Sequence, residues 1–179
     1  MATKHGISTS TQERILMGPG AVYINGVLLG ATKGGNSFEI NRTINDVRPD
    51  GAKGKVKGFR FLASVEAILT VRLMEVTEQN IVYALAGSSV DNHVITGGEI
   101  SDSTYIPEVS IAAEIKGSTP ATENSAVEIT VKNALVEGPL TVNLPDSVEA
   151  VVELKFHAHF DPSTLTTEPW EITFTPVSA

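Results

Sequence analysis

The chain has 179 residues, of which 41% are hydrophobic and 19% are charged, values typical of one globular domain rather than a disordered chain. Cysteine is absent, which excludes disulfides, thiol catalysis and cysteine-ligated zinc. No run of about 18 apolar residues occurs, so the sequence predicts no membrane-spanning helix.

The net charge of −8 is unevenly distributed along the chain. Residues 1–60 carry nine Lys or Arg and four Asp or Glu, a net of +5, whereas residues 61–179 carry four and seventeen, a net of −13. Such asymmetry is typical of a nucleic-acid-binding arm, or of a basic and an acidic face on one particle.

In chain order, residues 1–18 are polar and are predicted to be a flexible N-terminal arm, followed by a single β domain over 19–179. Asn25-Gly26, between AVYI and VLLG, predicts a two-residue hairpin turn. GNSFEINRTI alternates as a strand, and a long strand follows from Phe59 to Val76, with its odd-numbered apolar residues from Phe59 to Leu73 on one face. Between the two strands lies a long loop, about residues 45–58.

One helix is predicted over about 77–87, with Thr77 as its N-cap and Gly87 at its C-terminal end. The remaining segments alternate as strands: YIPEVSIAAEIKG, AVEITVKNALVEG, SVEAVVELKFHAHFD and WEITFT. GSTPATENSA, between the first two, is predicted to be a loop. Strands joined by turns, with a single helix, predict a mainly β fold: an antiparallel two-sheet sandwich or half-barrel with one flanking helix.

The glycine-rich stretches GATKGGNS and DGAKGKVKG suggest phosphate binding, but neither ends in Gly-Lys-Ser/Thr and neither leads into a helix. No aromatic residue interleaves with the three lysines of the second stretch, which argues against nucleic-acid binding. His157 and His159, with Glu153, suggest zinc, but a third ligand would have to be His93 or His5, for which the spacing gives no support. No serine lies in a nucleophile elbow. We therefore predict no enzyme, and no catalytic, cofactor or metal site.

The span from Gly20 to Arg42, GAVYINGVLLGATKGGNSFEINR, resembles the opening of the tail tube (major tail) proteins of long-tailed bacteriophages. The segment DVRPDGAKGKVKG is similar to a glycine- and lysine-rich loop of that family, and LMEVTEQNI is similar to its joint between strand and helix. The resemblance covers about residues 18–87.

This resemblance implies hexameric rings that stack into a tube through which DNA passes. On this interpretation the long loop contacts the next ring, and its ring-stacking residues are Arg48, Asp50, Lys53, Lys55 and Lys57. An acidic lumen would let DNA slide without being held; the candidate lumen-facing residues are Glu128, Thr130, Glu149 and Glu153.

The partners implied are further copies of the chain and the tape measure, tail terminator and distal tail proteins, with no specific DNA binding and no membrane. The protein would be made in the bacterial host cytoplasm and would reside in the virion. The alternatives left open are a monomeric β-sandwich that binds a ligand or carbohydrate, and a related bacterial secretion-tube protein. A hydrolase would need a catalytic constellation that the sequence does not display.

Overall fold

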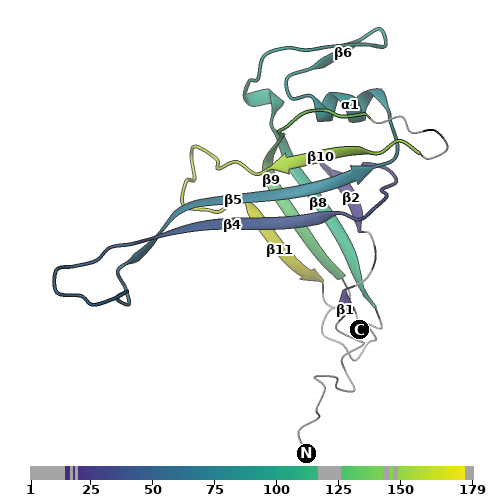
Figure 1. The fold of residues 1–179 in the computed structure, drawn as a ribbon. Helices are drawn as coiled ribbons and strands as arrows, with labels where there is room; N and C mark the ends of the chain where they lie inside the picture. The colour runs from purple at the N-terminus through teal and green to yellow at the C-terminus, as the bar shows by residue number, and fades with distance from the viewer. Residues whose placement is uncertain are drawn as a thin grey trace, which may run out of the picture.

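The computed structural model describes residues 15–16, 18, 20–116, 126–142, 146 and 149–175 (Figure 1). Its elements are β1 (Ile15–Leu16), β2 (Ala21–Ile24), β3 (Val27–Leu28), β4 (Ser37–Asp46), β5 (Arg60–Leu73), α1 (Glu78–Ala84), β6 (Ser89–Asp91), β7 (Val94–Thr96), a 3-10 helix (Asp102–Thr104), β8 (Ile106–Lys116), β9 (Ala126–Val136), β10 (Val152–His157) and β11 (Trp170–Thr175). The strands pair in the order β3-β2-β8-β9-β10-β5-β4, with β1 on β8, β11 on β9, and a separate β6–β7 hairpin. Every pairing between these strands is antiparallel.

Strand β9 joins two halves of the large sheet. Residues 126–134 pair with β8, and residues 126–131 also pair with β11, whereas Leu135 and Val136 pair with β10. The backbone at Asn133 is left-handed, with φ of 48°, between these two stretches. We call the two parts the β8 half-sheet (β3, β2, β8, the first part of β9, and β11) and the β5 half-sheet (the end of β9, β10, β5 and β4). Their strands run at a steep angle to each other in Figure 1.

The hydrophobic core lies between the two half-sheets, as in a β-sandwich. Val22, Val109 and Val131 come from the β8 half-sheet, and Leu69 and Phe156 from the β5 half-sheet, and all five are fully buried in one cluster. Along β10, buried and more exposed residues alternate as the sequence predicts. The predicted mainly β, sandwich-like fold with one flanking helix is confirmed.

Most element predictions agree with the structure. The turn at Asn25-Gly26 connects β2 and β3, with φ of 49° and 77° at these residues, as a type I′ turn requires. The helix is shorter than predicted: the Thr77 hydroxyl accepts a hydrogen bond from the Asn80 amide at 3.2 Å, but the helix ends at Ala84 rather than near Gly87. The β6–β7 hairpin was not predicted.

The N-terminal arm and one loop fall largely outside the described residues. Of residues 1–18, only Ile15, Leu16 and Gly18 are described; Ile15 and Leu16 form β1 and pair with Lys116 and Ile115. The predicted loop after β8 lies outside the described residues except for Ala126, which begins β9.

The long strand β5 departs from the predicted pattern at one point. Thr43 pairs with Ser64 but Ile44 pairs with Leu62, so Ala63 is an extra residue, a β-bulge. Beyond the bulge Leu62, not Phe61, shares a face with Ile44. The prediction that every odd-numbered residue back to Phe59 holds one face is therefore wrong.

Candidate functional site

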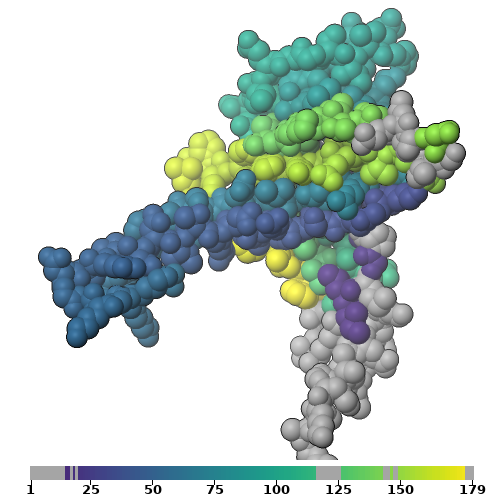
Figure 2. Space-filling model, in the orientation of Figure 1, coloured from purple at the N-terminus to yellow at the C-terminus, as the bar shows by residue number. Residues whose placement is uncertain are grey.

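The β4–β5 ribbon leaves the sandwich and projects from the body as an arm (Figures 1 and 2). We define the arm as residues 44–62, which include the loop between the two strands. On β5, residues from Ala67 to Leu73 alternate into the core, but residues from Arg60 to Ser64 are all exposed. Two strands without a sheet or helix to cover them are only marginally stable in water. The arm therefore exposes both of its strands to solvent among the described residues.

Asp46 holds the base of the arm loop. Its carboxylate lies 2.6 Å from Arg60 Nε and 3.3 Å from Lys55 Nζ, and the Val47 amide donates to the Phe59 carbonyl at 2.8 Å. Desolvation alone raises the pKa of Asp46, but the hydrogen bonds from Lys55 and Arg60 outweigh it and lower the pKa below its ordinary value of 3.8. The loop is thus closed by an ion-pair cluster.

The five predicted ring-stacking residues all lie on the arm and are exposed. Lys55 is partly engaged by Asp46, whereas Arg48, Lys53 and Lys57 form no ion pair with another described residue. The arm carries five basic and two acidic side chains, a net of +3, which leaves −11 on the rest of a chain whose net charge is −8. Its exposed side chains also include large apolar ones: Ile44, Val47, Phe59, Phe61 and Leu62.

The four predicted lumen-facing residues do not share one face. Glu128 and Thr130 alternate with the core residues Val127 and Val131, so they lie on the outer face of the β8 half-sheet. Glu153 lies on the outer face of the β5 half-sheet, on the opposite side of the core. Because the core separates the two faces, one channel wall cannot contain both.

Two of the predicted carboxylates, Glu149 and Glu153, are held by cations at the β5 half-sheet. Arg72 Nε lies 3.1 Å and Lys155 Nζ lies 3.5 Å from the Glu153 carboxylate. Glu149, which precedes β10, forms an ion pair with Lys33. The hydrogen bond from Arg72 lowers the pKa of Glu153, and that from Lys33 lowers the pKa of Glu149. These two carboxylates are therefore poor sources of net negative potential.

The outer face of the β8 half-sheet carries carboxylates that no described cation holds. Pairing places Glu128 beside Ala112 and Thr173, and Thr130 beside Ser110 and Glu171. Glu108 and Glu114 of β8 share this face, and like Glu128 they form no ion pair among the described residues, whereas Glu171 lies 3.0 Å from Lys132. This face can carry the acidic surface that the sequence predicted for a lumen.

The two histidines that were considered as zinc ligands, His157 and His159, contact carboxylates and a backbone carbonyl. His157 Nδ1 lies 3.3 Å from the Glu66 carboxylate. His159 Nδ1 lies 3.0 Å from the His157 carbonyl, and its Nε2 lies 3.4 Å from the Glu137 carboxylate. Among the described residues no group of three potential ligands is positioned to hold a metal ion. His5 lies outside the described residues.

A second feature, which the sequence analysis missed, lies at another side of the body. We call residues 74–104, which contain α1, β6, β7 and the 3-10 helix, the helix–hairpin block (Figure 2). It contains five exposed carboxylates and no lysine or arginine; they belong to Glu75, Glu78, Asp91, Glu99 and Asp102. The acidic character of this block could have been predicted from the sequence, because no Lys or Arg occurs between Arg72 and Lys116.

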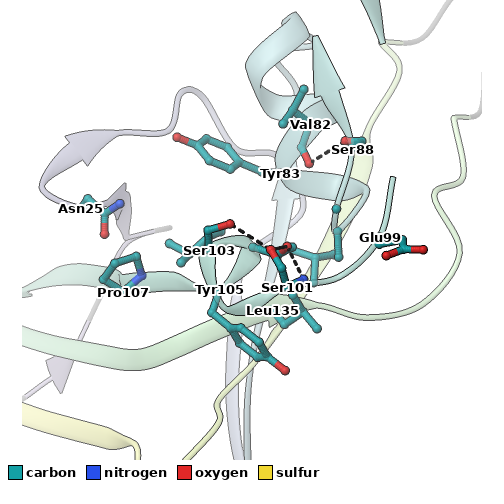
Figure 3. A pocket seen from close by; sticks show the side chains of 15 residues that line it. Asn25, Val82, Tyr83, Ser88, Glu99, Ser101, Ser103, Tyr105, Pro107 and Leu135 are labelled. Carbon is teal, nitrogen blue, oxygen red and sulfur yellow. Dashed lines mark hydrogen bonds between the residues drawn. The ribbon is translucent and has the colours of Figure 1, made fainter. Parts of the chain in front are cut away.

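A pocket of about 390 Å³ lies between this block and the start of β8 (Figure 3). Tyr83, Tyr105 and Leu135 form apolar walls, and Glu99 is among the residues that line it. The Ser101 and Ser103 hydroxyls lie 2.9 Å apart and bond to each other. The Ser101 hydroxyl also lies 3.5 Å from the Thr104 hydroxyl.

No protein-family model matches the sequence, and a search of curated proteins finds no match. Within the described part of the chain, no helix has the length and apolar character needed to cross a bilayer.

Proposed function

We propose that this chain is the subunit of a tail tube of a long-tailed bacteriophage: copies associate into hexameric rings, and the rings stack into a conduit for DNA. Its further partners would be the tape measure, tail terminator and distal tail proteins, and its location would be the virion. The proposal extends the resemblance of residues 18–87 to that family.

The observation that carries this proposal is the arm. It combines exposed large apolar side chains, such as Phe59 and Phe61, with a net positive charge on an acidic protein. Exposed apolar surface on a projecting ribbon favours burial against a partner. A second copy of an acidic chain is a partner of complementary charge.

The open edges of the sheet support ring formation. Strand β4 ends the pairing order at one side of the large sheet, and its ten residues leave a long edge. Strand β11 pairs only with β9 among the described strands. Long unpaired edges promote association with another strand, and closing a ring of subunits would remove them.

The outer face of the β8 half-sheet is the better candidate for the lumen wall in such a tube, because its carboxylates Glu108, Glu114 and Glu128 form no ion pair among the described residues. Glu128 and Thr130 remain candidates there, joined by Glu108, Glu114 and Glu171. A predominantly acidic wall repels phosphate, so DNA would pass without being bound. In this proposal Glu149 and Glu153, on the other side of the core, lie outside the lumen.

The alternative of a monomeric carbohydrate-binding sandwich gains no support from the single tryptophan. Trp170 is half-buried, its indole Nε1 donates to Glu168 at 2.7 Å, and the Arg42 guanidinium lies 5.5 Å from its ring centre. The ring is therefore covered by a protein cation rather than available as a stacking platform for a sugar.

Sedimentation velocity over increasing protein concentration tests the proposal. We expect species far larger than the 19.0 kDa monomer to appear as concentration rises. The variant K53E/K55E/K57E should stop at the size of a single ring, because rim charge directs stacking. The charge-preserving variant K53R/K55R/K57R should assemble like the natural chain. A natural chain that sediments as a monomer at every concentration would refute the proposal.

A further inference from the structure

The arm and the helix–hairpin block lie on different sides of one subunit. The arm tip projects at the left of the view, whereas the block, including α1, lies at the top (Figures 1 and 2). Among the described residues, no ion pair joins the arm to the block. The carboxylates of the helix–hairpin block are therefore not paired with the basic residues of the arm in the same subunit, as far as the described ion pairs show.

The two surfaces are complementary in charge. The arm has a net charge of +3, and the block has five carboxylates with no lysine or arginine. Two of these carboxylates have contacts within the subunit: Glu75 accepts from the Ala31 amide at 2.8 Å, and Glu78 lies 2.7 Å from His93 Nδ1. The other three project from exposed positions with no lysine or arginine partner among the described residues: Asp91, Glu99 and Asp102.

The two surfaces also match in polarity. The block exposes Val76, Val90, Val94 and Ile100 among its carboxylates, with exposed fractions from 41% to 59%. The arm exposes Phe61 at 52%, and it also carries Arg60 and three exposed lysines. A central apolar area with a charged rim is the usual anatomy of a protein–protein interface.

Resting on the proposed function, we infer that the arm of one subunit docks on the helix–hairpin block of a second copy. Lys53 and Lys57 would face the carboxylates around Asp91 and Glu99, and the arm's apolar side chains would cover the exposed valines of the β6–β7 hairpin. The arm and the block are different surfaces, so each docked copy still has either its own arm or its own block free for the next copy. Such a heterologous contact repeats from copy to copy, and in the proposed tube it would link subunits of successive rings.

Compensating charge reversals test this contact. K53E/K57E in the arm and D91K/E99K in the block should each raise the concentration needed for tube growth by at least about tenfold, which corresponds to ~1.4 kcal/mol. Combining all four changes in one chain should restore growth to within about threefold of the natural chain, because opposite charges face each other again. The readout is turbidity and pelleting of assembled tubes.

The control E108K/E114K makes the same charge change as the block variant, but on the outer face of the β8 half-sheet. Combined with K53E/K57E, it should not restore growth. The lysines introduced by D91K/E99K could disturb folding, so the neutral variant D91N/E99Q is tested as well. Circular dichroism should show that it is folded, and it should also weaken tube growth. If natural tubes form but the block variants grow normally, or the fourfold variant fails to recover, the contact is wrong. If the natural chain forms no tubes, the proposed function fails instead.

Discussion

Asp46 is the residue that gives the arm loop a defined base. Its carboxylate contacts both Arg60, across the β4–β5 pair, and Lys55, within the loop. The side chain is mostly covered, with 17% of it exposed. A carboxylate held by two cations keeps its charge to lower pH than a free one. The sequence placed these residues in one loop region, but it contained no sign that Lys55 would turn back toward Asp46 instead of facing outward.

The titration of Asp46 checks this arrangement. Carbon-detected NMR should give a midpoint below 3.8, and Arg60→Met should move it upward because one hydrogen-bond donor is lost. Since the folded-state pKa is lowered, the ion-pair cluster stabilises the arm fully above 3.8, and this contribution is lost as the pH falls through the folded pKa. A midpoint at 3.8 or above in the natural chain would contradict the cluster.

Asn133 is the residue at which β9 passes between the half-sheets. Its φ of 48° is unfavourable for β-branched side chains, and its amide Nδ2 donates to the His159 carbonyl at 3.3 Å. We expect Asn133→Val to lower the free energy of unfolding by about 1–2 kcal/mol in urea denaturation. Asn133→Gly tolerates this backbone and should cost less. Equal stability of the two variants would show that the left-handed conformation is not required.

At the scale of elements, β5 serves two purposes along one strand. Its C-terminal part, including Leu69 and Leu73, fills the core, and its N-terminal part belongs to the arm. The apolar alternation of the sequence correctly predicted the strand. It could not reveal the bulge at Ala63, because a bulge depends on pairing with β4 and not on the strand's own residues.

Two leucines of β5 test this division within one strand. Leu69→Ala should destabilise the monomer by about 2–5 kcal/mol, because it leaves a cavity beside Phe156 and Phe38. Leu62→Ala, at an exposed site of the arm, should change the free energy of unfolding of the monomer by no more than about 0.5 kcal/mol. Chemical denaturation of dilute protein measures both. Similar losses for the two variants would show that the arm packs as part of the core.

Local sequence predicted the helix of the helix–hairpin block but not its hairpin. Thr77 predicted the start of α1 correctly, since its side chain caps the helix. The β6 and β7 strands have only three residues each, too few for an alternation signal. Their turn at Asn92-His93 needs positive φ at both residues and lacks the glycine that identified the β2–β3 turn.

For the whole molecule, the candidate lumen residues show that a sequence does not tell on which side of the core a polar strand residue will lie. Glu128 and Glu153 occupy equivalent places in alternating strands, so the sequence assigned them one role. Their placement on opposite sides of the core follows from how β9 joins the two half-sheets, which is a property of the whole topology. The charges that neutralise Glu153 come from Arg72 and Lys155, and Arg72 is distant in sequence.

The arm, the helix–hairpin block and the edges of the large sheet share one property. Each is a feature that the described ion pairs and strand pairings within one subunit leave largely uncovered and that repeated copies would cover. A chain with a net charge of −8 has to overcome its own repulsion to assemble, and a basic arm set against an acidic block lowers that cost. We therefore expect assembly to depend on the arm.

Negative-stain electron microscopy of the purified chain at increasing concentration gives a direct test of self-assembly into a tube. We predict stacked rings and long hollow tubes for the natural chain. As a control, a variant in which residues 47–59 are replaced by Asn-Gly keeps the β4–β5 pairing and should remain folded but form no tubes. Dispersed single subunits of the natural chain at every concentration would contradict the account.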